Sequence, residues 1–362
     1  MRNEIGSNFE LNPEISLDCY GSTLGIEFLE LKGNDSAFLS TGRGAENFVL
    51  ATISERNPDI RKVALIPPFT CHTVIEPFIK HGYKVISYQI DSALNVNLNK
   101  FRESLIASEA QVVLVHRYFG FDTLKGFEEI IDEFSPKGIV FIEDITQCIY
   151  SGFDSLPVDY IIGSLRKWAC LPDGGFAICK TGVFMNKPSN YDRELERLKL
   201  EASYAKYEYL HNNIGEKQHY LDLFRKAEQQ LDLEVSYFHI SPASVAIQKS
   251  LDLPMLKKKR RDNYRRLYEE LKGSDMLQIL TPELTEADVP LYFVISLKER
   301  EELQNHLRLH DIYAPIVWTK AEVCPEICNE AQSIYESVLC LPIDQRYGEN
   351  DMERILNVIR KK

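Results

Sequence analysis

Short apolar runs separated by amphipathic segments fill the first half of the chain and limit the folds open to it. The runs that predict strands are Val63–Ile66, Lys84–Tyr88, Gln111–His116, Gly138–Glu143 and Asp159–Gly163. Between them the sequence predicts helices at Cys71–His81 and from about Leu124 to Phe134. Strands with continuous apolar character, separated by helices, are typical of a mostly parallel sheet covered on both faces. We therefore predict an α/β fold.

The second half of the chain is more helical. One long helical segment is expected from about Asp192 to Leu233, broken near Asn212–Gly215, and another from Ser241 to about Lys272. A strand at Leu291–Leu297 follows, with helices at Glu299–His310 and Glu349–Arg360. We predict a large domain over residues 1–245, which includes the helical segment 192–233, and a small C-terminal α/β domain over residues 246–362.

Composition narrows the possible partners. The chain has 362 residues, 44% of them hydrophobic, which is enough for the core of about two domains. Its formal charge of -12 disfavours binding to nucleic acid or to an anionic membrane, although a local basic pocket for a phosphorylated small molecule remains possible. No apolar run could span a bilayer, and the polar segment Met1–Glu10 lacks the apolar part of a signal peptide. A cytoplasmic location is expected.

The cysteines favour reduced thiols rather than disulfides or a metal site. There are eight of them, and most lie in apolar stretches. Cys324 and Cys328 form the only close pair, and no histidine lies near them in the sequence. We predict no metal site.

Chemically active side chains follow several of the predicted strands. Ligands of open α/β sheets bind beyond the C-terminal strand ends. Asp144 ends one strand, with Gln147 three residues later, and Ser164 and Lys167 follow the next. Each feature alone is common, because a strand-end aspartate often caps a helix and a lysine beside a tryptophan is usually a surface residue. Their shared location at one sheet edge predicts a site.

This set suits pyridoxal phosphate. The cofactor needs a lysine for its Schiff base, a carboxylate that keeps the pyridine nitrogen protonated, and a cradle for its phosphate. Lys167 and Asp144 are the candidates for the first two. Thr41-Gly42-Arg43-Gly44-Ala45 opens a predicted helix at Glu46–Ser54, whose first N–H groups could bind the phosphate together with Ser164. Pro172–Gly175 predicts a tight turn into a further apolar strand.

Taken together, these motifs resemble the DegT/StrS family of sugar aminotransferases, which have fold type I among the pyridoxal-phosphate enzymes. The likeness covers nearly the whole chain. Its further elements are Ile5–Phe9, Pro67-Pro68-Phe69-Thr70 with Gly82 and Asp91, Val115-His116 with Phe119-Gly120, and Leu341-Pro342-Ile343-Asp344. The resemblance implies Asp144 on the pyridine nitrogen, Gln147 near the phenolic oxygen, Ser164 at the phosphate and Lys167 as the Schiff-base lysine.

The sequence departs from the family pattern in three motifs and in the helical segment 192–233, which is longer than usual. Ser164 and Lys167 are three residues apart where members often have S-F-x-x-x-K, although the shorter spacing is common elsewhere in fold type I. The position where many members place a ring-stacking aromatic is Cys71, followed by His72. Where members have an asparagine that reaches the partner subunit's phosphate, residues 236–241 offer Tyr237 and His239.

The implied activity is a transamination in two half-reactions. An amino donor, glutamate by the resemblance, supplies nitrogen to a keto sugar, expected to be nucleotide-linked, in glycan or amino-sugar synthesis. The resemblance also implies a homodimer in which Tyr237 or His239 serves the partner's cofactor, against the alternative that both residues pack within their own chain. Rival hypotheses are another pyridoxal-phosphate reaction, such as dehydration or an amino-acid transformation, and a non-enzymatic regulator. The family's dehydratases replace the Schiff-base lysine, so its presence favours transamination.

Three other features have two interpretations each. His72 and His116 could be catalytic, although in this fold type the lysine moves the proton. The cluster Lys257–Arg261, with Arg265 and Arg266, could bind a nucleotide diphosphate, but such runs are more often a solvated helix face paired with acids. The stretch Tyr204–Tyr209 could line a substrate pocket or pack between helices.

Overall fold

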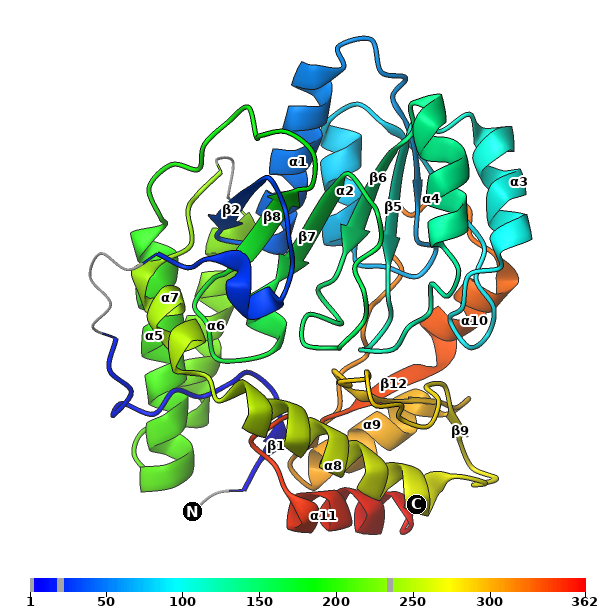
Figure 1. The fold of residues 1–362 in the computed structure, drawn as a ribbon. Coiled ribbons are helices and arrows are strands. Elements are labelled where there is room, and N and C mark those ends of the chain that lie inside the picture. Colours follow the sequence, from blue (N-terminus) through cyan, green and yellow to red (C-terminus); the bar gives the residue numbers. More distant parts are fainter. Residues whose placement is uncertain (1–2, 18–22, 233–236) are drawn as a thin grey trace.

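A seven-stranded sheet forms the larger part of the molecule in the computed structural model, which describes residues 3–17, 23–232 and 237–362 (Figure 1). The strand order is β2-β8-β7-β6-β5-β3-β4. The strands are β2 Asp35–Leu39, β3 Val63–Ile66, β4 Lys84–Ser87, β5 Val112–His116, β6 Val140–Asp144, β7 Tyr160–Ser164 and β8 Gly175–Cys179. All neighbouring pairs from β7 to β4 are parallel, and β8 runs antiparallel to β7 and β2. The predicted α/β fold with a mostly parallel sheet is confirmed.

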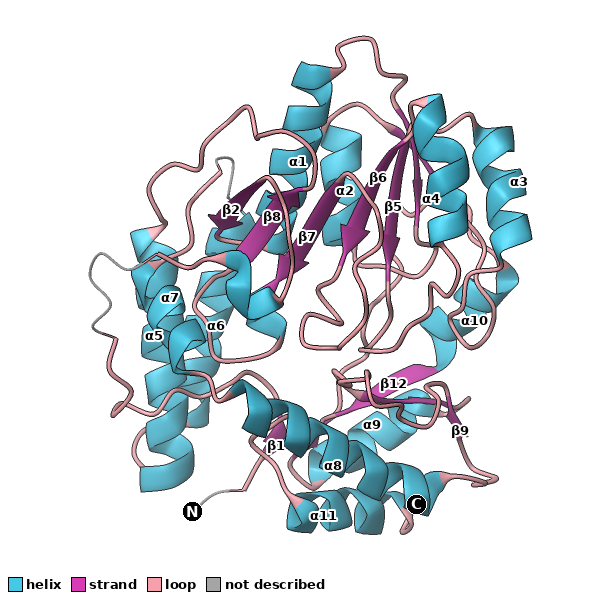
Figure 2. Ribbon diagram, viewed as in Figure 1, coloured by secondary structure: helices cyan, strands magenta, loops and turns pink. Residues whose placement is uncertain are grey.

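Helices cover both faces of this sheet, as the cyan helices on either side of the magenta strands show (Figure 2). All residues of strand β5 are buried, which explains why its sequence does not alternate between polar and apolar residues. Val112 and Leu114 belong to the core beneath α1 and α2, whereas Val113 and Val115 belong to the core beneath α3 and α4. The helix bounds are α1 Gly42–Arg56, α2 His72–Lys80, α3 Leu98–Ser108 and α4 Glu128–Phe134.

The first long helical segment is a helical hairpin. Helix α5 Arg193–Tyr207 continues into a π-helical turn, η4 Glu208–Asn212, and α6 Lys217–Asp232 returns beside it. The chain reverses at Asn213, whose φ of 56° is left-handed. The predicted break near Asn212–Gly215 is therefore confirmed, while Leu233, the predicted end, lies outside the described residues.

The prediction of one continuous helix from Ser241 to Lys272 is wrong. The segment forms two helices, α7 Pro242–Ser250 and α8 Leu253–Leu271. Leu251 has an extended ψ of 127°, and the Asp252 carboxylate accepts a hydrogen bond from the Met255 N–H at 2.9 Å. An aspartate N-cap followed by a proline in the first turn signals a new helix start, and Asp252-Leu253-Pro254 carries that signal. The predicted domain division at residue 245 falls within α7 and stays a prediction.

The C-terminal part contains a small antiparallel sheet in the order β12-β10-β9. The strands and helices of the C-terminal part are β9 Gln278–Ile279, β10 Phe293–Ser296, α9 Arg300–Leu309, β11 Ile312–Tyr313, α10 Asn329–Ser337, β12 Val338–Leu341 and α11 Glu349–Ile359. The N-terminal strand β1 Ile5–Gly6 pairs in parallel with β11, so the start of the chain lies against its C-terminal part. Single 3-10 turns lie at η1 Ile26–Leu29, η2 Ser135–Lys137 and η3 Leu165–Lys167. No helix in the described ranges is both long and apolar enough to cross a membrane.

A buried carboxyl joins the turn before β8 to the start of α7. Asp173 is fully buried, and its carboxyl oxygens accept hydrogen bonds from the Ser241 N–H at 3.1 Å and the Ser241 hydroxyl at 2.9 Å. Burial raises the pKa of Asp173 to about 7, although the hydrogen bonds from Ser244 and Ser241 oppose this. The folded chain thus holds a proton that the unfolded chain releases near pH 4.

This carboxyl is expected to weaken the fold as pH rises. Between about pH 4 and pH 7 the folded chain binds more protons at Asp173 than the unfolded chain does. The contribution of Asp173 to the free energy of unfolding therefore falls by up to about 4 kcal/mol over this range and is constant at higher pH. Asp173→Asn, which keeps a neutral acceptor, should remove this component. We expect the variant to gain stability relative to the wild type between pH 5 and pH 8 in urea unfolding. Asp252→Asn, at an exposed cap, is the control, and equal pH slopes in wild type and Asp173→Asn would refute the assignment.

Candidate functional site

The polar residues predicted at the strand ends line one cavity of about 350 Å³. Its lining includes the last residues of β5, β6 and β7. These strand ends point toward the C-terminal part of the chain (Figure 1). The predicted site residues in its lining are Gly42, Arg43, Cys71, His72, Asp144, Gln147, Ser164 and Lys167. Gly44 and Tyr237 lie outside the lining.

Lys167 is held at this cavity by a single turn of 3-10 helix after β7. The next residue, Trp168, is fully buried, and its indole N–H donates to the Thr146 carbonyl at 2.8 Å. Trp168 therefore fixes the backbone while the lysine side chain stays accessible from the cavity. Protein surrounds the amine on most sides, and this burial, with the nearby charge of Arg166, lowers the pKa of Lys167. Water in the open cavity weakens the lowering, but its direction favours the neutral, nucleophilic amine.

Asp144 ends β6 beside the lysine. The side chain is 8% exposed and accepts a hydrogen bond from the Thr146 N–H at 2.8 Å. The Thr146 hydroxyl in turn accepts from the Ser164 N–H at 3.0 Å, which ties the ends of β6 and β7 together. Burial raises the pKa of Asp144, whereas the bonds to Thr146 and the charge of Lys167 lower it. A cationic ring nitrogen placed here would favour the charged carboxylate further.

The N-terminus of α1 is pressed against Ser164. A Cβ added to Gly42 would lie 3.1 Å from the Ser164 Cβ, so glycine permits this close approach. The Thr41 hydroxyl caps the helix by accepting from the Gly44 N–H at 2.8 Å. The Gly44 N–H is therefore not free for a phosphate, contrary to our expectation. The N–H groups of Gly42 and Arg43 remain, because the first turn of a helix gives them no internal acceptor.

The guanidinium of Arg43 donates its hydrogen bonds to groups of the protein itself. It donates to Glu76 at 3.2 Å, to the Leu231 carbonyl at 2.9 Å and to Asp232 at 3.3 Å. These contacts link α1 to α2 and to the end of α6. Arg43 thus belongs to the cavity wall, but its side chain holds the wall together instead of standing free for phosphate.

An aromatic pair forms another wall. The ring of Trp318 lies 5.8 Å from that of His116 at an angle of 21°, and both residues line the cavity. Burial lowers the pKa of His116 to about 3, so the imidazole is neutral, and its Nε2 has no hydrogen-bond partner in the described chain. Cys71 and His72 also line the cavity, at the start of α2. The flat surface therefore comes from residues other than the pair at positions 71 and 72.

Gln147 and Tyr237 make contacts within the chain. The Gln147 side-chain oxygen accepts from the Phe119 N–H at 2.6 Å, which orients its amide at the cavity. The ring of Tyr237 packs edge-on against Phe48 at 5.4 Å, which agrees with the alternative of packing in its own chain. Donation by Tyr237 to a partner subunit stays a prediction. Ser236, the first residue of the stretch compared with the family's asparagine segment, lies outside the described residues.

Sequence reasoning missed one acid of the site, Glu46. It lines the cavity from α1, is 1% exposed, and its Oε1 has no hydrogen-bond partner among the described residues. Burial, with the charges of Asp144 and Cys71, raises the pKa of Glu46 well above its usual range. Its place four residues after Gly42, on the inward face of the helix, was the available signal.

Comparisons with known proteins give structural neighbours only. No family model matches the sequence, and no curated protein matches it. Among solved structures, a DegT DnrJ EryC1 StrS aminotransferase from Brucella abortus is 18% identical, with 98% of this chain and 91% of that chain covered and a TM-score of 0.66. Helicobacter pylori PseC, an aminotransferase involved in the biosynthesis of pseudoaminic acid, is 14% identical, with 99% of both chains covered and a TM-score of 0.71.

A third neighbour catalyses a different reaction on the same scaffold. The E. coli GDP-4-keto-6-deoxy-D-mannose-3-dehydratase, solved with bound hydrated pyridoxal phosphate, is 15% identical, covers 98% of this chain and 100% of that chain, and has a TM-score of 0.68. Identities this low establish the fold. The chain has the fold shared by the DegT/DnrJ/EryC1/StrS aminotransferases and this pyridoxal-phosphate-bound dehydratase.

Proposed function

We propose that the protein is a pyridoxal-phosphate-dependent aminotransferase that acts on a keto sugar. The observation that carries the proposal is the meeting of Lys167 and Asp144 in one cavity with the N-terminus of α1 and Ser164. A reactive amine, a buried carboxylate and an anion-binding helix start are the groups that this cofactor needs. The likeness to the neighbouring sugar enzymes supports the same assignment.

The cavity fits the cofactor on its own geometry. The close approach of Gly42 to Ser164 makes a narrow cradle with free N–H groups, suited to a phosphate. The flat pair of His116 and Trp318 suits an aromatic ring. Buried polar atoms without partners in the described chain occur at Glu46 Oε1 and His116 Nε2, both from residues that line this cavity. Such atoms are uncommon unless something absent from the bare chain completes them.

Each residue has a separate task. Bound pyridoxal phosphate supplies a ring that accepts electrons from a carbanion. Asp144 would hold a proton on the pyridine nitrogen, which would strengthen that electron demand. Lys167 would hold the cofactor through its amine, and the free amine would serve as the base that moves the proton of the donor's α-carbon. Ser164 and the first N–H groups of α1 would hold the phosphate, and Gln147 would contact the ring.

Substrates and assembly follow from the resemblance. We propose glutamate as the amino donor and a nucleotide-linked keto sugar as the acceptor, as part of amino-sugar or glycan synthesis. We also propose a homodimer, in which Tyr237 of each chain serves the other chain's cofactor. Dehydration is the second candidate, because one neighbour of the same fold is a dehydratase. The lysine at position 167 favours amino transfer.

A two-stage absorbance experiment tests this function. The protein is saturated with pyridoxal phosphate and then mixed with glutamate in the absence of any acceptor. We expect the visible cofactor band to be replaced by the near-ultraviolet band of the aminated cofactor, with stoichiometric 2-oxoglutarate, and keto-sugar nucleotides to restore the visible band. A protein that binds no cofactor is a scaffold. Loss of water from the sugar without a stable aminated sugar product identifies the dehydratase.

A further inference from the structure

A second cavity, of about 530 Å³, adjoins the first. Arg166, Lys167 and Glu228 line both, so the two cavities meet at the reactive lysine. The walls of the second cavity come from the N-terminal segment Gly6–Phe9, the helical hairpin and the C-terminal part. A molecule that reacts at Lys167 can therefore extend into this space.

The second cavity is strongly cationic in an acidic chain. Its charged lining residues are Arg166, Lys167, Lys199, Arg260, Arg308 and Arg346, against the acids Glu228 and Asp344. The formal charge of the whole chain is -12. Such a local excess of positive charge within low-dielectric walls attracts anions.

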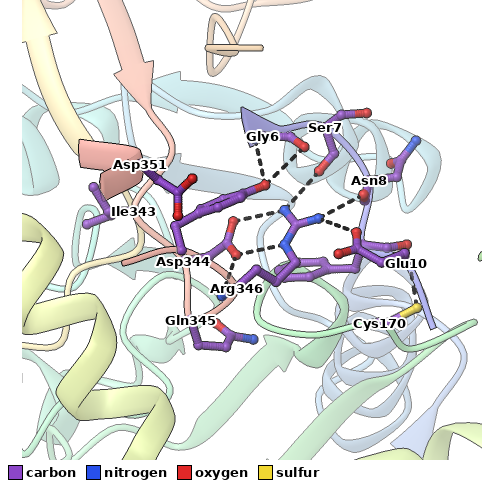
Figure 3. A network of polar contacts seen from close by, with 12 residues as sticks. Gly6, Ser7, Asn8, Glu10, Cys170, Ile343, Asp344, Gln345, Arg346 and Asp351 are labelled. Atoms are coloured by element: carbon purple, nitrogen blue, oxygen red, sulfur yellow. Dashed lines mark hydrogen bonds and ion pairs between the residues drawn. The ribbon is translucent and has the colours of Figure 1, made fainter. Parts of the chain in front are cut away.

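Two of these cations are neutralised within the protein. Arg346 forms ion pairs with Asp344 at 2.8 Å and Glu10 at 2.9 Å and also donates to the Ser7 and Asn8 carbonyls, as Figure 3 shows. Lys199 forms a short ion pair with Glu228. The positive charges of both side chains are therefore already paired with carboxylates of the protein.

Arg260 and Arg308 have different limits. Arg260 is 1% exposed and donates to Gln345 and to the Leu291 carbonyl, and burial lowers its pKa to about 10. It contributes positive charge, but its donors are occupied. Arg308 is exposed and donates only to Asn305 at 2.8 Å among its described contacts, so it lies at the open side of the cavity.

Arg166 remains, directly beside the lysine. Its one ion pair in the described chain is with Glu228 at 3.7 Å, and that carboxylate is already held by Lys199. Its Nε is buried without a hydrogen-bond partner. A guanidinium with free donors at the junction of two cavities is suited to an anionic oxygen pair.

We propose that Arg166 binds an anionic group of the substrate in the second cavity, while the reacting end of the substrate lies at Lys167. The part of this inference that concerns the reaction at Lys167 rests on the proposed function, whereas the binding of an anion by Arg166 does not. The shared chemistry is a pair of anionic oxygens, which a carboxylate of the amino donor or a phosphate of the sugar nucleotide can supply. Arg166 is then the residue that determines specificity for that group.

Direct binding of small anions tests the proposal. Succinate stands for the carboxylate source and inorganic pyrophosphate for the phosphate source, each titrated by calorimetry into cofactor-loaded and cofactor-free protein at low salt. We expect Arg166→Met to weaken binding of at least one probe by about tenfold or more, the order of a charge-assisted bidentate contact, and Arg166→Lys to weaken it less. Arg197→Met removes one exposed cation from the same hairpin, where Arg197 pairs with Glu194 and Glu201, and should leave binding unchanged.

The two probes and the two protein forms separate the outcomes. Loss for succinate alone assigns the carboxylate, and loss for pyrophosphate alone assigns the phosphate. Equal binding of both probes to wild type and Arg166→Met, or no binding to the wild type, overturns the proposal. Attachment of cofactor at Lys167 in Arg166→Met shows that the first cavity is intact. If the wild type takes up no cofactor, the proposed function fails while the titration of cofactor-free protein still decides the anion site.

Discussion

Borohydride reduction of the cofactor-saturated protein is expected to leave a pyridoxyl group on Lys167, and Lys167→Ala is expected to abolish this label and to lower turnover strongly. Lys167 stands at the junction of the two cavities, and burial together with Arg166 lowers its pKa, which favours the nucleophilic amine. Because the variant loses the group that transfers the proton, activity should fall by at least about 10²–10⁴-fold. Peptide mapping of the reduced protein locates the label.

Other lysines provide the controls. Lys180→Ala, at the end of β8 away from both cavities, should keep label and turnover. Lys199 is buried and lines the second cavity, so it is the lysine that competes most directly with Lys167 for the label. A label on Lys199 or elsewhere, or an active Lys167→Ala, would contradict the assignment of the reactive lysine.

Asp144→Asn should preserve the fold and lower turnover by about a hundredfold or more. A neutral amide cannot hold a proton on the pyridine nitrogen, and loss of one such electrostatic partner typically costs this much. The substitution is nearly isosteric, and the oxygen can still accept from the Thr146 N–H, so the ends of β6 and β7 should stay joined. Steady-state kinetics with glutamate, together with cofactor titration, measures both effects.

A modified cofactor separates lost charge from lost structure. N-methylated pyridoxal phosphate carries a fixed positive charge, so it should restore part of the turnover in Asp144→Ala, where the smaller side chain leaves room for the methyl group. Asp159→Asn is the matched control. Asp159 directly precedes β7, at the edge of the sheet opposite to Asp144, and its carboxylate accepts a hydrogen bond from the Phe141 N–H at 2.8 Å. Near-wild-type turnover in Asp144→Asn would show that the ring nitrogen lies elsewhere.

The parallel sheet was predictable because local pattern and burial agree there. Strands β3, β5, β6 and β7 are short apolar runs buried on both faces, and the six predicted strands of this sheet, including β8 after the Pro172–Gly175 turn, all exist. The edge strand β2 and the helices α3 and α10 were not predicted. Their sequences mix polar and apolar residues, and their place is set by neighbours: β2 pairs with β8, and α3 packs under the sheet through Phe101 and Leu105. The pairing of β2 with β8 has no local signal, whereas the Asn97 N-cap and the four-residue spacing of Phe101 and Leu105 were a local signal for α3.

The candidate site shows the same division. Asp144, Ser164 and Lys167 could be predicted because strand ends of one sheet meet at one edge. Trp318 could not, because it lies more than 150 residues beyond Lys167 and reaches the cavity only through the packing of the C-terminal part. The role of the Arg43 side chain was missed for a related reason: two of its three partners, Leu231 and Asp232, belong to the far end of the helical hairpin.

The Arg346 network has a consequence for the order of events during synthesis. Gly6, Ser7 and Glu10 are synthesised long before the partners that fix them, Arg346 and Tyr347, because the Gly6 N–H to Tyr347 hydroxyl bond joins residues 341 positions apart. The large sheet draws its strands from residues 35–179 and can form while the rest of the chain is still being translated. Closing so long a loop late is slow compared with local folding. The wall that the N-terminal segment lends to the second cavity therefore forms after the large sheet, and a nascent chain could acquire its cofactor cradle before it can hold a substrate.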